Sequence, residues 1–200
     1  EGRTDNIRQI VQRYGIEHPV VNDRDFEVWS TWGARAWPTV VAIDPAGNIV
    51  GGHSGEGIYR IFEPVVGALV DEFDARGEID RSPVALRPEA DRSPDSLLSY
   101  PGKVLADPDG GRLFVADTNH HRIVIADLDT GEVIDVAGNG RPGLEDGGFG
   151  GASFDQPQGM ALSDDGATLY VADTANHAIR SLDLDRRTVG TALGTGFQAT

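Results

Sequence analysis

The stretch RLFVADTNHHRIVIADL, residues 112–128, returns later in the chain as TLYVADTANHAIRSLDL, residues 168–184. Both stretches belong to longer copies, residues 100–140 and 156–196, which align without a gap from end to end. The segment 141–155 lies between the two copies. A match in constant register over this length indicates a tandem structural repeat.

Each copy predicts four short β-strands separated by turn sequences such as DPDGG and LDTGE. In the first copy the strands are expected at Gly102–Ala106, Leu113–Asp117, Arg122–Asp127 and Val133–Ala137. A four-stranded tandem repeat of roughly 40 residues is typical of a β-propeller blade. The alternative is two hairpin pairs of a β-sandwich. The fixed register disfavours it, because the strands of a sandwich need not resemble one another.

The second copy contains the pattern P.G.AL..DG..LYVADT.NHAI, which resembles the NHL repeat, and GRPGLEDGGFGGASFDQPQGMAL resembles the segment between NHL blades. This resemblance covers about residues 100–200. It implies a propeller of about six blades that serves as a binding platform for a protein partner. Two blades cannot close a ring and leave sheet edges unpaired, so we expect the chain to be a piece of a longer protein.

Four repeat positions are candidate structural residues: Asp117 with Asp173, and His121 with His177. A residue that recurs in each blade is expected to support the fold rather than a reaction, and we expect both carboxylates to accept backbone N–H groups across the ADT turn. His120 has no histidine counterpart in the second copy and is expected to face solvent. Neighbouring strand residues point to opposite faces, so His120 and His121 are not expected to bind a metal together.

The front part of the chain, residues 1–80, follows a different pattern, with apolar residues at helical spacing alternating with short apolar runs. Helices are expected at residues 6–16 and 25–34 and from Ile58 to Phe73, and strands at residues 18–23, 37–44 and 49–55. The predicted order is therefore helix, strand, helix, strand, strand, helix.

This order, together with GARAWPTVVAIDPAGNIVGGHSGEG, resembles the C-terminal part of a thioredoxin fold. The resemblance implies that the Trp37–Pro38 peptide bond is cis and that Trp37, Pro38 and Thr39 shape a substrate groove. Two alternatives stay open: Pro38 opens an edge strand, and Trp29, Trp32 and Trp37 are aromatic residues of the core and its shell.

Both resemblances occur together in the family of NHL-repeat-containing protein 2. The expected fold class is α/β followed by all-β. The domains are the C-terminal part of a thioredoxin-like domain at 1–76, a Pro- and Arg-rich linker at 77–96 and partial NHL blades at 97–200. In that family a cysteine-bearing turn lies in a β–α–β segment upstream of the first helix, and the present sequence is expected to begin after it.

Composition narrows the function further. The 200 residues contain no cysteine, so they hold no disulfide, thiolate zinc site or thiol nucleophile. The net charge is −15, with 16 acidic and 10 basic residues in 1–94 and 16 acidic and 7 basic residues in 95–200. This charge disfavours nucleic acid and anionic lipid as partners. No cofactor, metal or catalytic residue is expected, and the compartment stays open with the cytoplasm favoured.

Three functions stay open after the sequence analysis. The first is a part of a thiol–disulfide redox protein or redox-linked scaffold, in which these residues supply no thiol chemistry. The second is a non-catalytic scaffold that binds proteins through the propeller. The third and least favoured is a hydrolase or lyase with a metal in the propeller channel, which needs inward-pointing ligands from several blades.

Overall fold

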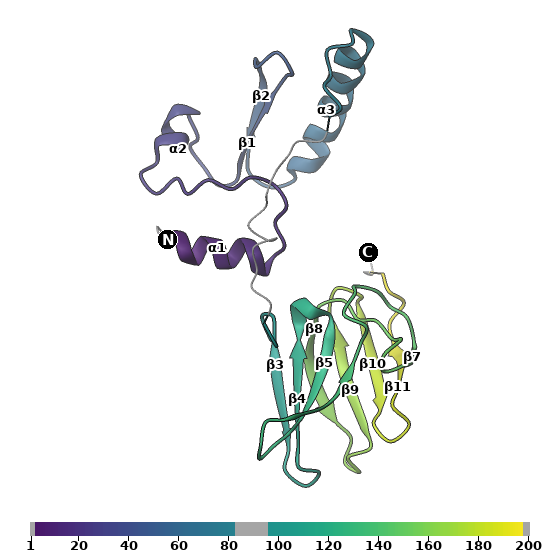
Figure 1. Ribbon diagram of the computed structural model, residues 1–200. Helices are drawn as coiled ribbons and strands as arrows, with labels where there is room; N and C mark the ends of the chain where they lie inside the picture. Colours follow the sequence, from purple (N-terminus) through teal and green to yellow (C-terminus); the bar gives the residue numbers. More distant parts are fainter. Residues whose placement is uncertain (1–2, 83–95, 198–200) are drawn as a thin grey trace. The chain divides into compact units, whose positions relative to one another are not determined.

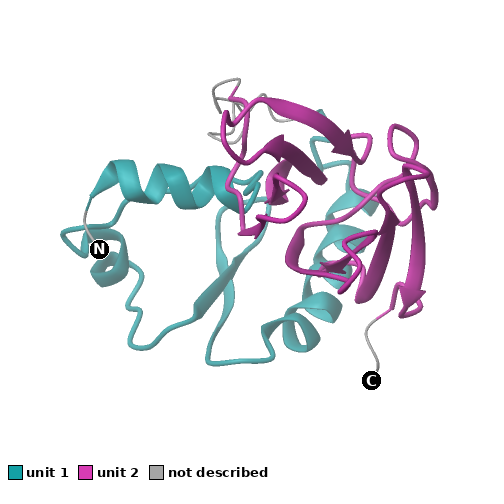
Figure 2. Ribbon diagram, turned by 90° about the horizontal axis from the view of Figure 1, so that it is seen from below, with its two compact units in different colours: residues 1–93 teal, residues 94–200 magenta. Residues whose placement is uncertain are grey.

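The computed structural model of the chain describes residues 3–82 and 96–197. The chain divides into two compact units, Glu1–Ser93 (unit 1) and Pro94–Thr200 (unit 2), which Figure 2 shows in different colours. Most of the linker expected at 77–96 lies outside the described residues. Each unit is described by itself.

Within its described residues, 3–82, unit 1 contains three helices and one β-hairpin (Figure 1). These elements are α1 (Thr4–Arg13), α2 (Glu27–Thr31), β1 (Thr39–Ile43), β2 (Ile49–Ser54) and α3 (Ile58–Ala75). β1 and β2 pair antiparallel, with Val41 opposite Gly52. The Asp44 carboxylate closes their turn by accepting the Asn48 N–H at 2.8 Å, as expected for an Asp-Pro-x-Gly turn.

The strand expected at residues 18–23 is wrong, because the chain there is irregular. A strand needs a neighbouring strand to satisfy its backbone N–H and C=O groups. In the described part of unit 1 the sheet consists of β1 and β2 alone, so this segment has no strand beside it. Val21 is accordingly 72% exposed.

Unit 1 has few fully buried side chains. Among its described apolar residues, Val11, Ala42 and Phe73 are buried, one each from α1, β1 and α3. Trp32 and Trp37, considered above as possible core residues, are exposed at 44% and 75%. Large apolar area therefore stays in contact with solvent in this unit.

Unit 2 consists of two antiparallel sheets in meander order. The first sheet contains β3 (Lys103–Asp107), β4 (Arg112–Asp117), β5 (Arg122–Asp127) and β6 (Val133–Ala137). The second contains β8 (Pro157–Leu162), β9 (Thr168–Asp173), β10 (Ala178–Asp183) and β11 (Thr188–Leu193), and the short β7 (Gly147–Gly148) extends it beside β11. The predicted four strands per copy are confirmed, and β7 is an addition from the segment between the copies.

The two sheets pack face to face and share one apolar core. The first sheet contributes Phe114, Ala116, Ile123, Ile125 and Ala137, and the second contributes Leu169, Val171, Leu182 and Val189. Phe149, Ala152 and Phe154, from the segment that connects the sheets, complete the core. Stacking is required because one four-stranded sheet has too little core of its own.

The opposite faces of the two sheets differ. On the second sheet Tyr170 and Leu193 are exposed at 42% and 69%, as expected for a blade face without a neighbour. On the first sheet Val115 and Val124 are buried, whereas Val104, which pairs with Val115 on the same face, is 66% exposed. Each sheet therefore exposes some apolar side chains on its outer face.

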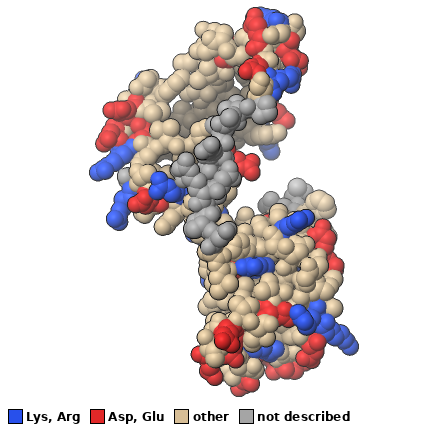
Figure 3. All heavy atoms as spheres, viewed as in Figure 1, with Lys and Arg blue, Asp and Glu red and all other residues tan. Residues whose placement is uncertain are grey.

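Acidic side chains gather at one end of unit 2, the lower end in Figure 3. These side chains belong to the turns that join β3 to β4, β5 to β6, β8 to β9 and β10 to β11, and to the adjoining strand ends. They are Asp107, Asp109, Asp127, Asp129, Asp164, Asp165, Asp183 and Asp185. Several of these carboxylates close their own turns. Asp127, for example, accepts the Thr130 N–H at 2.8 Å, and this bond lowers the pKa of its carboxyl.

Candidate functional site

The first repeat position, Asp117 at the end of β4, is fully buried and completely bonded. Its Oδ1 accepts the Ser99 N–H at 2.6 Å. Its Oδ2 lies 2.8 Å from His120 Nδ1 and accepts Arg122 Nε–H at 2.9 Å. A buried carboxylate needs such donors to offset its lost hydration.

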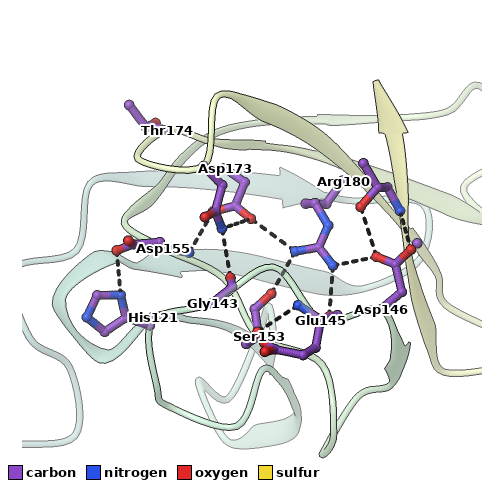
Figure 4. A network of polar contacts seen from close by, with 12 residues as sticks. His121, Gly143, Glu145, Asp146, Ser153, Asp155, Asp173, Thr174 and Arg180 are labelled. Carbon is purple, nitrogen blue, oxygen red and sulfur yellow. Dashed lines mark hydrogen bonds and ion pairs between the residues drawn. The ribbon is translucent and has the colours of Figure 1, made fainter. Parts of the chain in front are cut away.

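Asp173 at the end of β9 has the same kind of environment (Figure 4). Its Oδ1 accepts the Asp155 N–H at 2.7 Å, and its Oδ2 accepts from Asn176 Nδ2 at 2.9 Å and Arg180 Nη1 at 3.0 Å. In both sheets the backbone donor lies 18 residues before the aspartate. The prediction that backbone N–H groups of the ADT turn donate to these carboxylates is therefore wrong. The backbone donor belongs to the loop that precedes each sheet.

The arginine partner comes from different positions in the two sheets. Arg122 is the first residue of β5, whereas Arg180 is the third residue of β10. Val124 occupies the position equivalent to Arg180, and Ala178 the position equivalent to Arg122. The two arginines therefore have the same role at different positions of the repeat. Alignment of the copies does not reveal this shared role, because it places neither arginine opposite the other.

Arg180 also ties the connecting segment to the second sheet. Its side chain is fully buried and donates to the carbonyls of Ser153 at 2.6 Å and Glu145 at 2.9 Å (Figure 4). Its Nη2 pairs with Asp146 Oδ1 at 2.7 Å. One side chain thus joins a strand, a buried carboxylate and the loop of residues 143–155.

Asp146 extends this network to β11. Its carboxylate accepts the N–H of Thr191 at 3.1 Å and the hydroxyl of the same residue at 2.9 Å. Partial burial raises the pKa of the Asp146 carboxyl, but the bonds from Arg180 and Thr191 outweigh it and the net shift is downward. The network therefore joins the connecting segment to both β10 and β11.

The histidines differ from each other in their contacts. His120 was expected to face solvent, but its ring contacts the buried Asp117, at the position where the second sheet has Asn176. His121 Nδ1 lies 3.2 Å from Asp155 Oδ1 and 3.3 Å from the N–H of Gln156. His177 has the matching left-handed backbone, with φ of 47° against 50° for His121, and its side chain is exposed.

Unit 1 contains an aromatic groove next to Trp37. The Trp37–Pro38 peptide bond is cis, as expected. The rings of Trp29 and Trp37 lie 4.6 Å apart, and a cavity of about 400 Å³ adjoins them. Its walls are formed by Asp23, Val28, Trp29, Trp32, Ala34, Trp37, Thr39, Val41 and Ile43.

The structure brings two of the three expected groove residues, Trp37 and Thr39, to this cavity. Pro38 is not among its lining residues, and its carbonyl accepts the Gly55 N–H at 2.9 Å. The hydroxyl of Thr39 is held by Ala36 O at 2.6 Å and by Ser54 Oγ at 2.7 Å. Trp29 and Trp32, for which a place in the core or its shell was the alternative, also line the cavity.

Within residues 3–82 and 96–197, no group of three or more His, Asp or Glu side chains is placed to hold a metal ion. No helix in those ranges is long and apolar enough to cross a membrane.

Comparison with known proteins shows what the chain is similar to. The NHL repeat model matches residues 98–126. NHL repeat-containing protein 2 of Gallus gallus is 39% identical over 97% of this chain and 26% of its own length. Protein SUPPRESSOR OF QUENCHING 1, chloroplastic, of Arabidopsis thaliana is 38% identical over 96% of this chain and 18% of its own length.

A shorter similarity concerns a redox protein. Thiol-disulfide oxidoreductase ResA of Halalkalibacterium halodurans is 37% identical over 24% of this chain and 28% of its own length. The chain spans about a quarter of the NHL repeat-containing protein 2 sequences that it matches. By its NHL repeat and over nearly its whole length, the chain is therefore similar to NHL repeat-containing protein 2.

Proposed function

We propose that the chain is part of a protein-binding scaffold, in which unit 1 is thioredoxin-like and holds an extended polypeptide in the groove beside Trp37. The helix–hairpin–helix order of unit 1 and the cis bond before β1 support the thioredoxin-like assignment. The partial similarity to a thiol-disulfide oxidoreductase supports it as well. The NHL sheets supply the platform to which the groove is attached.

The observation that carries the proposal is the position of β1 beside the groove. Thr39, Val41 and Ile43 of β1 line the cavity together with Trp37. Apolar walls of this kind can bind the alternate side chains of an extended peptide.

The redox alternative has less support from these residues. Thiol–disulfide exchange begins with attack by a thiolate, and the 200 residues contain no cysteine. Any thiol chemistry of a larger protein therefore needs cysteines outside these residues. Trp37 and Thr39 would then position a substrate without reacting with it.

Intrinsic fluorescence tests the groove directly, since the three tryptophans, at positions 29, 32 and 37, all belong to unit 1. Titration with carboxymethylated insulin B chain, an extended apolar polypeptide without thiols, should change the emission in a saturable way. Trp37→Ala should weaken binding at least about tenfold, equivalent to roughly 1.4 kcal/mol. Tyr59→Ala, an exposed aromatic of α3 away from the groove, is the matched control. Equal affinity of both variants would exclude the groove.

Insulin reduction with dithiothreitol separates scaffold from reductase. The chain should give the rate of the buffer control, because it has no thiolate. Turnover above that control would show that the scaffold proposal omits a chemical activity.

A further inference from the structure

Unit 1 contains a second cavity, which shares a wall with the groove beside Trp37. This second cavity has a volume of about 520 Å³, and Asp23, Trp29 and Trp37 line both cavities. Its other lining residues are Arg3, Ile7, Val21, Asn22, Arg24 and Phe26, and we call it the arginine pocket. No arginine lines the groove within the described residues. A polypeptide that passes the Trp29–Trp37 pair therefore leaves an apolar environment for a basic one.

A hydrogen bond between two chain segments brings the arginines to the same pocket. Asn22 Nδ2 donates to the hydroxyl of Thr4 at 3.1 Å, which fastens the first turn of α1 to the segment before α2. Arg3 directly precedes α1, and Arg24 follows Asn22 by two residues. The two arginines, which are far apart in the sequence, therefore line one cavity.

Both guanidinium groups are available to a ligand. Arg3 and Arg24 are exposed, and among the residues that the structure describes neither side chain has a hydrogen bond or an ion pair. The carboxylate of the pocket is engaged instead: Asp23 Oδ1 accepts the N–H of Val28 at 2.9 Å, and its Oδ2 accepts that of Trp29 at 2.8 Å. The pocket thus presents two unpaired cations beside one carboxylate that holds the first turn of α2.

Phe26 adds an exposed aromatic wall to the pocket. Its φ of 58° lies in the left-handed region, which is rare for a residue with a bulky side chain. The ring packs edge-on against Trp29, with the ring centroids 6.2 Å apart, and Phe26 is 50% exposed. Backbone strain of this kind clusters at functional sites. Phe26 therefore marks the pocket, independently of its charge, as a candidate binding site.

The chemistry of the pocket favours a single carboxylate attached to an apolar body. A guanidinium group binds a carboxylate through two parallel hydrogen bonds, and aromatic walls accommodate apolar side chains. A polyanion is disfavoured because the chain carries a net charge of −15. One carboxylate in contact with Arg24 is much less affected, since salt screens charges that lie farther away than about 8 Å at physiological ionic strength.

We propose that the groove of unit 1 selects polypeptides with an acidic residue next to the apolar residue that binds at Trp37, and that Arg3 and Arg24 bind the acidic side chain. This inference rests on the proposed peptide groove and adds its substrate class. Neighbouring residues of an extended chain are about 3.3 Å apart. Because the Trp29–Trp37 pair belongs to both cavities, an apolar residue can occupy the groove while its acidic neighbour reaches the arginine pocket.

The test compares two forms of insulin B chain that differ in charge. Alkylation with iodoacetate adds carboxymethyl groups to its cysteines, whereas iodoacetamide adds carbamidomethyl groups of almost the same shape without the charge. Each modified cysteine follows an aliphatic residue in that polypeptide, which matches the proposed arrangement. Tryptophan fluorescence of the full 200-residue chain gives both affinities.

The carboxymethylated form should bind at least about threefold more tightly at low salt, the effect expected of exposed ion pairs, and about 1 M NaCl should reduce this ratio toward one. Arg24→Gln, and separately Arg3→Gln, should weaken binding of the carboxymethylated form and reduce the ratio. Both arginines are exposed, so their substitution should leave the far-UV circular dichroism unchanged. The matched control is Arg60→Gln, an exposed arginine of α3 that lines neither cavity, and it should leave the ratio unchanged.

The possible outcomes separate this inference from the proposed function. Equal affinity for both forms would overturn the selectivity and leave the peptide groove in place. Equal effects of Arg24→Gln and Arg60→Gln would attribute the preference to overall charge, and would also overturn it. Absence of binding by either form would instead exclude the groove itself and, with it, its selectivity.

Discussion

Asp173 and Arg180 form an ion pair in which both side chains are fully buried, with Arg180 Nη1 3.0 Å from Asp173 Oδ2. The pair lies where the connecting segment, β9 and β10 meet, and both partners also bond that segment. Taking two charges out of water is costly, and the further hydrogen bonds offset this cost. Removal of one partner leaves the other charge buried with fewer contacts.

Asp173→Asn should therefore lower the free energy of unfolding by about 3–5 kcal/mol, the cost of breaking a buried ion pair. Urea unfolding followed by circular dichroism measures the change. The control is Asp183→Asn, whose partner Arg186 is largely exposed, and its effect should stay below about 1 kcal/mol. Equal effects of both substitutions would show that the buried pair is not a major source of stability.

His120 and Asn176 occupy equivalent positions of the two copies, so we expect the protein to tolerate asparagine at position 120. His120→Asn should change the unfolding free energy by less than about 0.5 kcal/mol, because an Asn side chain donates to the matching carboxylate at 2.9 Å in the second sheet. His120→Leu removes the contact with Asp117 and should cost about 1 kcal/mol or more. Thermal unfolding of the two variants distinguishes them, and a large loss for His120→Asn would contradict the equivalence.

The hydrogen bond from Thr118 to Pro157, which joins the two sheets of unit 2, predicts that Thr118 contributes more to stability than its counterpart Thr174. Thr118→Val removes the bond to Pro157 O and leaves a buried carbonyl without its donor, so it should cost about 1–3 kcal/mol. Thr174→Val makes the same chemical change at an exposed site and should cost less than about 0.5 kcal/mol in this chain. Both are compared by urea unfolding. Equal losses of unfolding free energy would mean that the bond from Thr118 to Pro157 O adds no stability.

Asp146 predicts a dependence of stability on acid pH. Partial burial raises the pKa of its carboxyl, but the bonds from Arg180 and Thr191 lower it further, and the net shift is below the ordinary value of 3.8. A lowered pKa in the folded state means that its stabilisation is fully present above pH 3.8 and is lost as the pH falls through the lower value. In Asp146→Asn the unfolding free energy should consequently fall less steeply below about pH 4.

The measurement is unfolding free energy against pH from about 6 to 2.5, a range that spans the ordinary carboxyl pKa values. Asp129→Asn, an exposed turn residue, serves as the control for loss of one negative charge. Identical pH profiles for Asp146→Asn and the unsubstituted chain would contradict the link between this carboxylate and stability.

The strands of unit 2 could be predicted because each is bounded by turn residues and both copies repeat the same spacing. β4 and β9, at Arg112–Asp117 and Thr168–Asp173, begin and end at matching positions of the two copies. Asp117 and Asp173 were recognisable from this alignment as a matching pair. Their backbone donors were not, because Ser99 and Asp155 approach through tertiary contacts 18 residues away in the chain.

Other features depend on contacts that residue patterns do not encode. Arg180 is a charged strand residue, and its burial depends on tertiary contacts with the connecting segment, where it donates to the carbonyls of Ser153 and Glu145. The segment 18–23 has apolar residues that suit a strand, but in the described part of unit 1 neither strand of the sheet pairs with it. The aromatic groove was suggested at Trp37 by resemblance, whereas the contributions of Trp29 and Trp32 follow from the fold.

The two arginine positions, Arg122 in β5 and Arg180 in β10, have a consequence for how such a repeat diverges. Either of two strand positions can place a guanidinium on the buried aspartate, because both are close enough to the end of the preceding strand. Two copies of the repeat can therefore keep the same charge pairing while they differ at both arginine positions.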